Sequence, residues 1–143
     1  MKSSILFLVH CEEAFRVHFP DKMFPLRLRR ACQARKYDRV IALESKIDND
    51  NVAIQEITDV VTDKIDFGWG YEPECFDQEE KEFVIPTKSC HEYTWIPPEI
   101  RNMNLKNYKV FVGGGCESEC LQDFLDILTH LGIDYQKVKG YIF

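Results

Sequence analysis

The sequence predicts an α/β fold with a doubly wound, mainly parallel sheet. Two short runs, 5–9 and 110–112, are apolar throughout and contain β-branched and aromatic residues. Runs of this kind are typical of strands that are buried on both faces, as in parallel sheets. Segments with apolar residues at helical spacing alternate with such strands along the chain, and this alternation favours a parallel sheet that is covered by helices.

The first half of the chain is expected to hold two strands and two helical segments. Residues 5–9 form the first strand, and two prolines mark 15–25 as a loop. The second strand covers 40–43, and 52–61 is a helical segment rich in β-branched residues. The helix between the two strands is marked by apolar residues at helical spacing: Leu26, Leu28, Ala31, Cys32 and Ala34.

The second half opens with an aromatic loop over 66–78, and loops of this length are commonly functional. A third strand is expected over 81–85, closed by Pro86. The segment 87–95 is too polar to belong to the core. The other expected elements are a short helix over 97–103, a last strand over 133–138 and a packed apolar tail over 141–143.

The stretch 109–131 is the centre of the prediction. An apolar strand ends at three glycines, and a helix follows with Ser118 as its N-cap and Gly132 as its C-terminal stop. Cys116 and Cys120 therefore lie between the tip of a strand and the first turn of a helix. The helix dipole and the unpaired N–H groups at such a place lower a thiol pKa and stabilise an oxyanion. The stretch indicates a nucleophile, although a small buried hydrophobic role remains open for either cysteine.

Length and composition limit the number of domains and the classes of partner. A chain of 143 residues, 45% hydrophobic and 29% charged, is expected to form a single domain over 1–143. The net charge of −6 argues against a nucleic-acid partner, which would call for a basic stripe. The chain has six cysteines, and their scatter favours free thiols over a disulfide framework. The glycines lack the Gly-Lys-Ser/Thr of a phosphate loop, which disfavours nucleotide binding.

The N-terminus does not match a targeting signal. The apolar run 5–9 is shorter than a secretory core, and His10 stands where a lipoprotein signal needs a small residue before Cys11. No apolar stretch approaches the length of a membrane span. We expect a soluble, cytoplasmic protein without membrane association.

Three motifs in order resemble the isochorismatase-like cysteine hydrolases, which include nicotinamidases and N-carbamoylsarcosine amidohydrolases. Residues 5–15 are similar to the family's first strand and to the turn after it, which ends in a phenylalanine. Lys88 follows 84–87 as the family's lysine follows its middle strand. Residues 110–120 resemble the strand, cis-peptide turn and nucleophile of the family, and 40–48 resembles its second strand and the following Asp.

The resemblance implies a three-layer sandwich shortened at the C-terminus and an amidase-type cysteine hydrolase. Cys120 would be the nucleophile, and Lys88 its electrostatic partner. His10 would be the base in place of the family's Asp. The N–H groups of Cys116 and Cys120 would form the oxyanion hole. The substrate would be a small molecule with an amide or related C–N bond, bound against three aromatic side chains: Phe15, Trp69 and Tyr93.

The replacement of the family's Asp by His10 leaves the activity open. A histidine can form a thiolate–imidazolium pair, but the change also fits a protein that has lost its chemistry. The segment 48–56 contains no histidine, so the nicotinamidase-type metal site is not expected, and no cofactor is implied.

Two alternatives to the hydrolase remain. One is a catalytically silent binding or inhibitory protein that keeps the fold, with the aromatic loop as its contact surface. The other is a thiolate metal or redox site; its residues would be His10, Cys11, Cys116 and Cys120. A C-x3-C spacing without a second pair is not a zinc signature, which disfavours that site. The sequence leaves the oligomeric state open, a homo-oligomer included.

Overall fold

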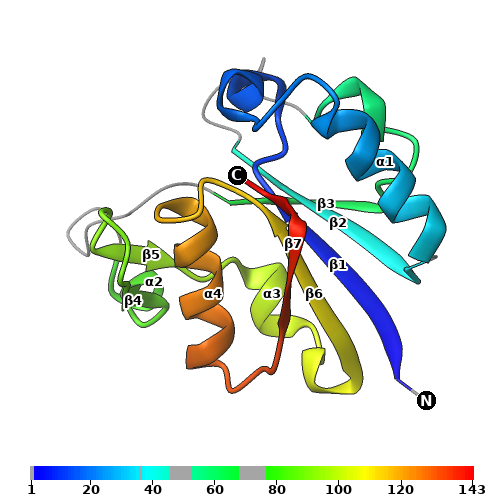
Figure 1. Cartoon of the computed structure of the whole chain (residues 1–143). Coiled ribbons are helices and arrows are strands. Elements are labelled where there is room, and N and C mark those ends of the chain that lie inside the picture. The colour runs from blue at the N-terminus through cyan, green and yellow to red at the C-terminus, as the bar shows by residue number, and fades with distance from the viewer. Residues whose placement is uncertain (1, 36, 46–52, 68–76) are drawn as a thin grey trace.

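A computed structural model describes residues 2–35, 37–45, 53–67 and 77–143. Within these ranges, five strands form one sheet in the order β3-β2-β1-β6-β7, and every neighbouring pair is parallel (Figure 1). The predicted parallel α/β fold is therefore confirmed. The strands are β1 (Ser3–Val9), β2 (Arg39–Glu44), β3 (Asp63–Asp66), β6 (Tyr108–Gly114) and β7 (Gln136–Ile142).

Helices cover both faces of the sheet, which gives three layers. Helix α1 (Phe24–Arg35) lies on one face, and α3 (Pro98–Asn102) and α4 (Cys120–His130) lie on the other (Figure 1). Side chains of β1 alternate between the two cores, because successive residues of a strand point to opposite faces. Phe7 belongs to the core under α4, and Leu6 and Leu8 belong to the core under α1. The central strand β1 is thus buried on both sides, as its apolar sequence predicts.

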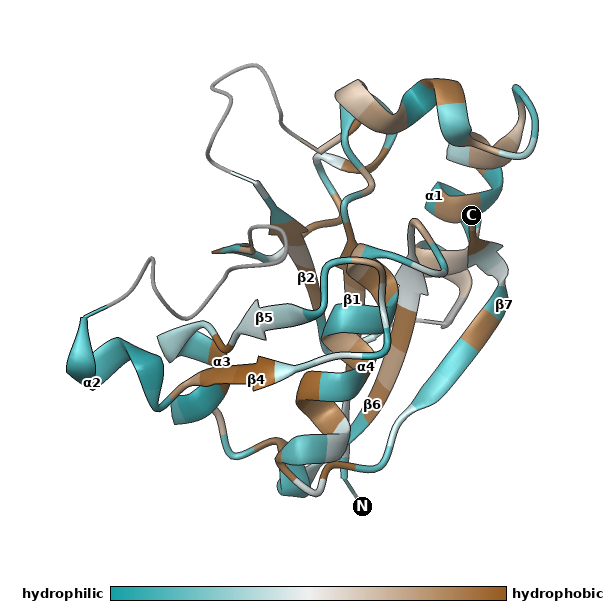
Figure 2. Cartoon of the chain, turned by 90° about the vertical axis from the view of Figure 1, so that its left-hand side faces the viewer, coloured by the Kyte–Doolittle hydropathy of each residue, from teal (hydrophilic) through white to brown (hydrophobic). Residues whose placement is uncertain are grey.

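A separate hairpin lies beside α4 (Figure 2). It consists of β4 (Val84–Pro86) and β5 (Tyr93–Trp95), which pair antiparallel, and α2 (Gln78–Lys81) precedes it. The expected strand over 81–85 is therefore shorter and does not belong to the parallel sheet. Thr94 of β5 is buried, so part of the polar segment 87–95 does enter the core.

One strand was not predicted, and three predicted segments differ from the structure in kind or extent. Strand β3 is missing from the prediction because only Ile65 is buried in it, and its charged neighbours hide the apolar pattern. The expected helix over 52–61 is, in its described part, a 3-10 turn at Gln55–Ile57 followed by turns. The loop 15–25 contains the end of a 3-10 helix, Glu13–His18, and the start of α1. The last strand begins at Gln136 rather than at residue 133.

Helix α4 keeps the predicted apolar face but starts differently. Its N-cap is Glu119, which makes no side-chain cap, and not Ser118. Its end is as predicted: Gly132 has φ +71, a conformation that favours glycine. The aromatic loop residues 68–76 lie outside the described residues. No described helix is long and apolar enough to cross a membrane.

Candidate functional site

The site is built where β1 and β6 end side by side. Val9 pairs with Gly114, which has φ +102, and a Cβ at Gly114 would lie 2.1 Å from the carbonyl oxygen of Val9. Only glycine allows this close approach. The next peptide bond, Gly115–Cys116, is cis, as the resemblance implies for this turn. The chain then enters α4 at Cys120.

The thiol of Cys120 is almost fully buried, with 6% of the residue exposed. Burial raises the pKa of the Cys120 thiol far above its usual range, and the carboxylates of Asp123 and Glu119 raise the pKa further. The expected lowering of this pKa by the helix start is therefore wrong. The desolvation of the sulfur and the two nearby negative charges both disfavour the thiolate. Cys120 is a protonated thiol at neutral pH and needs a base before it can attack.

A histidine–carboxylate pair lies next to this thiol. His91 Nδ1 is 2.6 Å from Asp123 Oδ2. His91, Cys120 and Asp123 each offer one nitrogen, sulfur or oxygen atom that could bind a metal, and these three atoms lie within 4.8 Å of one another. Asp123 is fully buried, whereas the His91 side chain is 21% exposed. A thiol, an imidazole and a buried carboxylate thus converge at the start of α4, an arrangement that supports nucleophilic catalysis.

The loop between β4 and β5 carries His91 and is fastened to α4 at two points. The Ser89 hydroxyl donates to Asp123 Oδ1, and the backbone N–H of His91 donates to Ser89 Oγ at 3.1 Å. The backbone N–H of Lys88 donates to Asp126 Oδ2 at 2.7 Å. Asp123 and Asp126 are three residues apart, so they lie on one face of the helix and hold the loop against it.

His91 and Asp123 are site residues that the sequence prediction missed. His91 was placed in a polar segment without a role. The signal that could have found the pair is the spacing of Cys120 and Asp123, which puts both side chains on one helix face. Asp123 also interrupts the apolar face of α4, and a buried carboxylate needs a partner.

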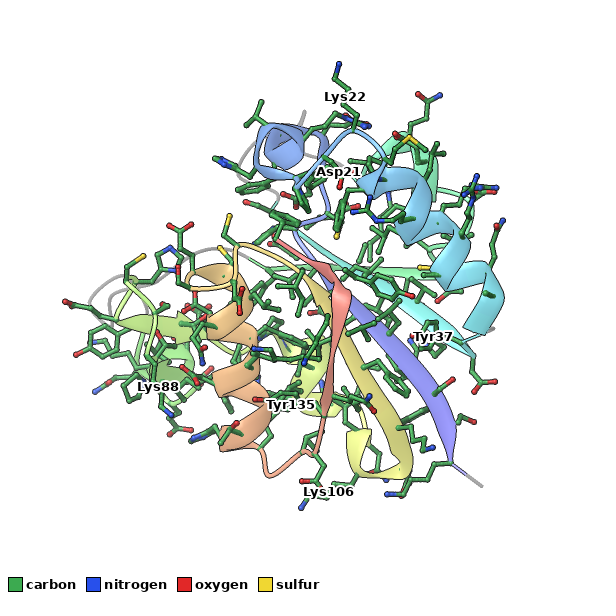
Figure 3. The ribbon with its side chains drawn as sticks, in the orientation of Figure 1. Asp21, Lys22, Tyr37, Lys88, Lys106 and Tyr135 are labelled. Atoms are coloured by element: carbon green, nitrogen blue, oxygen red, sulfur yellow. The ribbon has the colours of Figure 1, made fainter. Side chains whose placement is uncertain are left out.

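The structure does not bring Lys88 to Cys120. Its side chain is exposed, and it lines a surface groove with Asp126 and His130 of α4 and with Tyr135, which follows the helix. Figure 3 labels Lys88 and Tyr135. Asp126 lies six residues beyond Cys120, about 9 Å along the helix axis. The backbone N–H of Lys88 positions the loop, and among the described contacts none joins its amine to the thiol.

His10 is buried, and its described contacts do not include Cys120. Its Nδ1 lies 3.0 Å from Glu12 Oε1, and its ring packs near Phe15 and Phe67. Glu12 also accepts the backbone N–H of Ser45 at 2.6 Å. Two buried atoms of the pair, His10 Nε2 and Glu12 Oε2, have no hydrogen-bond partner among the described residues. The predicted role of His10 as the base is not supported by these contacts.

The other predicted site residues have mixed positions. Phe15 lies beside His10, and Tyr93 is half-buried in β5. Trp69 lies outside the described residues. The N–H groups of Cys116 and Cys120 are not donors in any described backbone hydrogen bond, and both remain candidates for an oxyanion hole.

The alternative metal set of His10, Cys11, Cys116 and Cys120, which the sequence disfavours, does not come together in the structure. Cys11 packs in the core under α1, because it points to the opposite face of the sheet from Cys120. A different set does converge: Cys90, His91 and Glu119 have ligand-type atoms within 4.8 Å of one another. The described cysteines, all but Cys75, are free thiols, as predicted.

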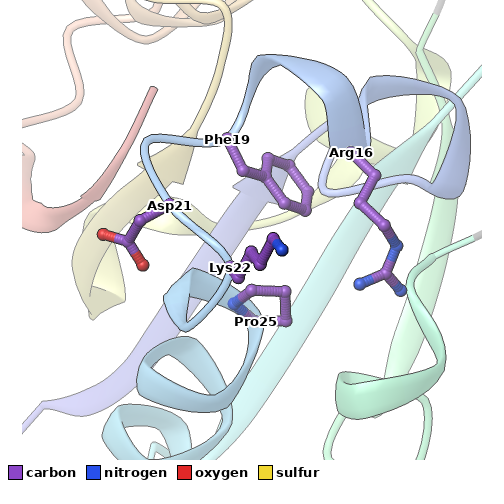
Figure 4. A pocket seen from close by; sticks show the side chains of 5 residues that line it. All are labelled: Arg16, Phe19, Asp21, Lys22 and Pro25. Carbon is purple, nitrogen blue, oxygen red and sulfur yellow. The ribbon is translucent and has the colours of Figure 1, made fainter.

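A pocket of about 360 Å³ lies elsewhere, between the 3-10 helix and the start of α1 (Figure 4). Its lining residues are Arg16, Phe19, Asp21, Lys22 and Pro25. Arg16 is already paired with Glu13 and Glu56, and Asp21 is paired with Arg27. The pocket shares no residue with the cluster at Cys120, so it does not enlarge that site.

Comparison with known proteins supports the fold alone. No protein-family model matches the sequence, and no curated protein matches it. A solved structure described as a putative Mar1 ribonuclease from Leishmania major is similar, with a TM-score of 0.63 and 15% sequence identity. The match covers 99% of this chain and 65% of that chain, so this chain spans less than two thirds of its neighbour. At this identity the likeness shows a shared fold and transfers no residue roles.

Proposed function

We propose that the chain is a cysteine hydrolase that cleaves an amide or related C–N bond of a small molecule. Cys120 is the nucleophile, His91 the general base and Asp123 the group that orients His91. The observation that carries this proposal is the convergence of the three side chains within 4.8 Å of one another at the start of α4. The proposal keeps the nucleophile of the isochorismatase-like resemblance and moves the base from His10 to His91.

The hydrogen bond to Asp123 gives His91 the tautomer that a base needs. Carboxylates only accept hydrogen bonds, so the imidazole proton is assigned to Nδ1, which faces Asp123 Oδ2. Nε2 is then the acceptor for the thiol proton. Because the pKa of Cys120 is raised, the proton moves to His91 as the sulfur attacks, and no preformed thiolate is needed.

The reaction proceeds in two steps. The Cys120 sulfur attacks the carbonyl carbon, the C–N bond breaks, and the leaving nitrogen takes the proton from His91. A thioester to Cys120 remains. Water then attacks this thioester and passes one proton to His91, and that proton returns to the thiol as the acid product leaves. The N–H groups of Cys116 and Cys120 are the candidates that stabilise the oxyanion in both steps.

A silent binding protein is the second candidate, and the burial of Cys120 favours it. A thiol with 6% exposure is reached by a substrate only if neighbouring groups move. In a silent protein, the His91–Asp123 pair would serve to fasten the β4–β5 loop to α4.

The test uses p-nitrophenyl acetate as an activated acyl probe. The hydrolase predicts a burst of one p-nitrophenolate per chain, and peptide mapping of the quenched protein should find the acetyl group on Cys120. Cys120→Ser should abolish the burst. Cys32→Ala is the matched control, because Cys32 is a buried thiol on the other side of the sheet, and it should acylate normally. An absent burst, or acetylation of other cysteines with Cys120 unmodified, would overturn the proposal and leave the silent protein.

A further inference from the structure

We propose that Cys120, His91 and Asp123 also form a binding site for a thiophilic divalent cation, Zn²⁺. The three residues offer one thiol, one imidazole nitrogen and one carboxylate oxygen within 4.8 Å of one another. These are the ligand types that zinc takes in proteins. The binding stands independently of the hydrolase, whereas its regulatory consequence rests on the proposed function.

The distances fit zinc after small side-chain movements. Tetrahedral zinc with bonds of about 2.0–2.3 Å sets its ligand atoms about 3.3–3.7 Å apart. The distance between His91 Nδ1 and Asp123 Oδ2, now 2.6 Å, would have to increase to reach this range. Any two ligand atoms that lie near the upper bound of 4.8 Å would have to approach each other by about an ångström. Cys120 and Asp123 are three residues apart on a single helix, so their backbones already present both groups to one point.

The surroundings of the three ligands suit a cation. The Ser89 hydroxyl holds Asp123 Oδ1 and so orients the carboxylate, leaving Oδ2 directed at His91. Hydrogen bonds of this kind fix metal ligands in their binding orientation. The carboxylates of Asp123 and Glu119 both act on the Cys120 sulfur. A dication would relieve this accumulation of negative charge while it displaces the thiol proton.

Cys90 and Glu119 are the candidates for a fourth ligand. Both have a ligand-type atom within 4.8 Å of one on His91, and Cys90 Sγ lies 3.6 Å from Glu119 Oε1. Cys90 is exposed, which gives a hydrated ion a point of entry. A closed site with two sulfur ligands would hold zinc more tightly than one completed by water.

Zinc at this site would bind the sulfur of the nucleophile and the imidazole of the base, with Nδ1 of His91 ligating the metal in place of its hydrogen bond to Asp123. If the chain is the hydrolase proposed above, the metal-free form acylates and the zinc form does not. Zinc would then act as a reversible inhibitor that also shields the thiol from alkylation.

The test is a zinc titration of the folded, metal-free protein in competition with a chromophoric chelator. We expect one zinc per chain, with affinity lowered by about 100-fold or more in Cys120→Ser and His91→Gln. Ser89→Ala, which removes only the group that orients Asp123, should weaken binding by about 10- to 100-fold. Cys32→Ala should bind as the wild type does. Co²⁺ in place of zinc should give a thiolate charge-transfer band that disappears in Cys120→Ser.

Two results would overturn the inference: no saturable binding by the wild type, or undiminished binding by Cys120→Ser. Circular dichroism of each variant identifies loss of folding, and the Co²⁺ band reports the sulfur ligand directly in the wild type. Acylation by p-nitrophenyl acetate in the presence of chelator separates this inference from the hydrolase. A metal-free protein that acylates but binds no zinc refutes the metal site alone, and an inert protein that binds zinc refutes the hydrolase alone.

Discussion

Asp123→Asn should change the acylation rate of Cys120 through two effects that act in opposite directions. Whether the rate falls or rises distinguishes a catalytic triad from a cluster that is only structural. The carboxylate acts on the thiol as a negative charge, which raises the pKa of Cys120. It also fixes the His91 tautomer through Oδ2, at 2.6 Å from Nδ1. Asparagine removes the charge, and it offers an N–H₂ donor in place of one of the two acceptor oxygens.

The electrostatic effect alone would accelerate the thiol. Two charges within 4.8 Å interact by roughly 3 kcal/mol at an effective dielectric constant of about 20, so removal of the Asp123 charge should raise the thiolate population by a factor on the order of 10². A lower pKa populates the thiolate but weakens its nucleophilicity, so the net gain is about 10-fold. General-base catalysis is worth about 10²- to 10⁴-fold, and it is lost when His91 is no longer held in the tautomer that accepts the thiol proton. With a triad, acylation should therefore fall by about 10- to 10³-fold.

The assay is the rate of p-nitrophenol release from p-nitrophenyl acetate at fixed neutral pH. Asp59→Asn is the matched control, because Asp59 pairs with Arg29 of α1 and has no described contact with the β4–β5 loop. It should acylate at the wild-type rate. Urea unfolding should show that Asp123→Asn costs about 2 kcal/mol, since hydrogen bonds to a buried carboxylate are lost. Acylation by Asp123→Asn at the wild-type rate or faster would refute the role of Asp123.

Two further predictions concern stability. Gly114→Ala should destabilise the fold by more than about 3 kcal/mol, because its Cβ would lie 2.1 Å from the Val9 carbonyl oxygen. Gly140→Ala is the control: its Cβ would meet nothing within 4 Å, so the unfolding free energy should change by less than about 0.5 kcal/mol. Equal melting temperatures of the two variants would contradict this prediction. Arg16→Met should cost about 1 kcal/mol near neutral pH, because Arg16 lies between Glu13 and Glu56 on a partly exposed surface. Its hydrogen bonds lower the pKa of both carboxyls in the folded state, so this stabilisation is present above their ordinary value of 4.5 and is lost as the pH falls below it; a cost that persists in acid would contradict the ion pairs as its cause.

The parallel sheet could be predicted because its inner strands are continuous apolar runs. β1 and β2 are buried on both faces, so their sequences alone identify them. The edge strand β3 could not be identified in this way, since only Ile65 is buried in it. The hairpin strand β5 was hidden because its inward residue is Thr94, a polar residue in a polar segment.

The candidate site was predicted in part. The glycine turn and the helix start indicate Cys116 or Cys120, because both are local features of the chain, and the resemblance selects Cys120. His91 could not be paired with it, since the contact spans the hairpin and α4 and depends on how a separate unit packs on the helix. Lys88 and His10 were assigned from motif order, which does not specify the direction of a side chain. The pKa of Cys120 was misjudged because burial and the charges of Asp123 and Glu119 are properties of the folded state.

The most direct test of the central claim compares two histidine variants, His91→Gln and His10→Gln, by their acylation rates with p-nitrophenyl acetate. Glutamine keeps a polar side chain at each position but cannot accept the thiol proton as imidazole does. If His91 is the base, His91→Gln should lose about 10²-fold or more of the rate. His10→Gln should keep most of it, because the described contacts of His10 are with Glu12, Phe15 and Phe67. A folded His91→Gln that acylates Cys120 at the wild-type rate, while His10→Gln does not, would contradict the account and return the base to His10.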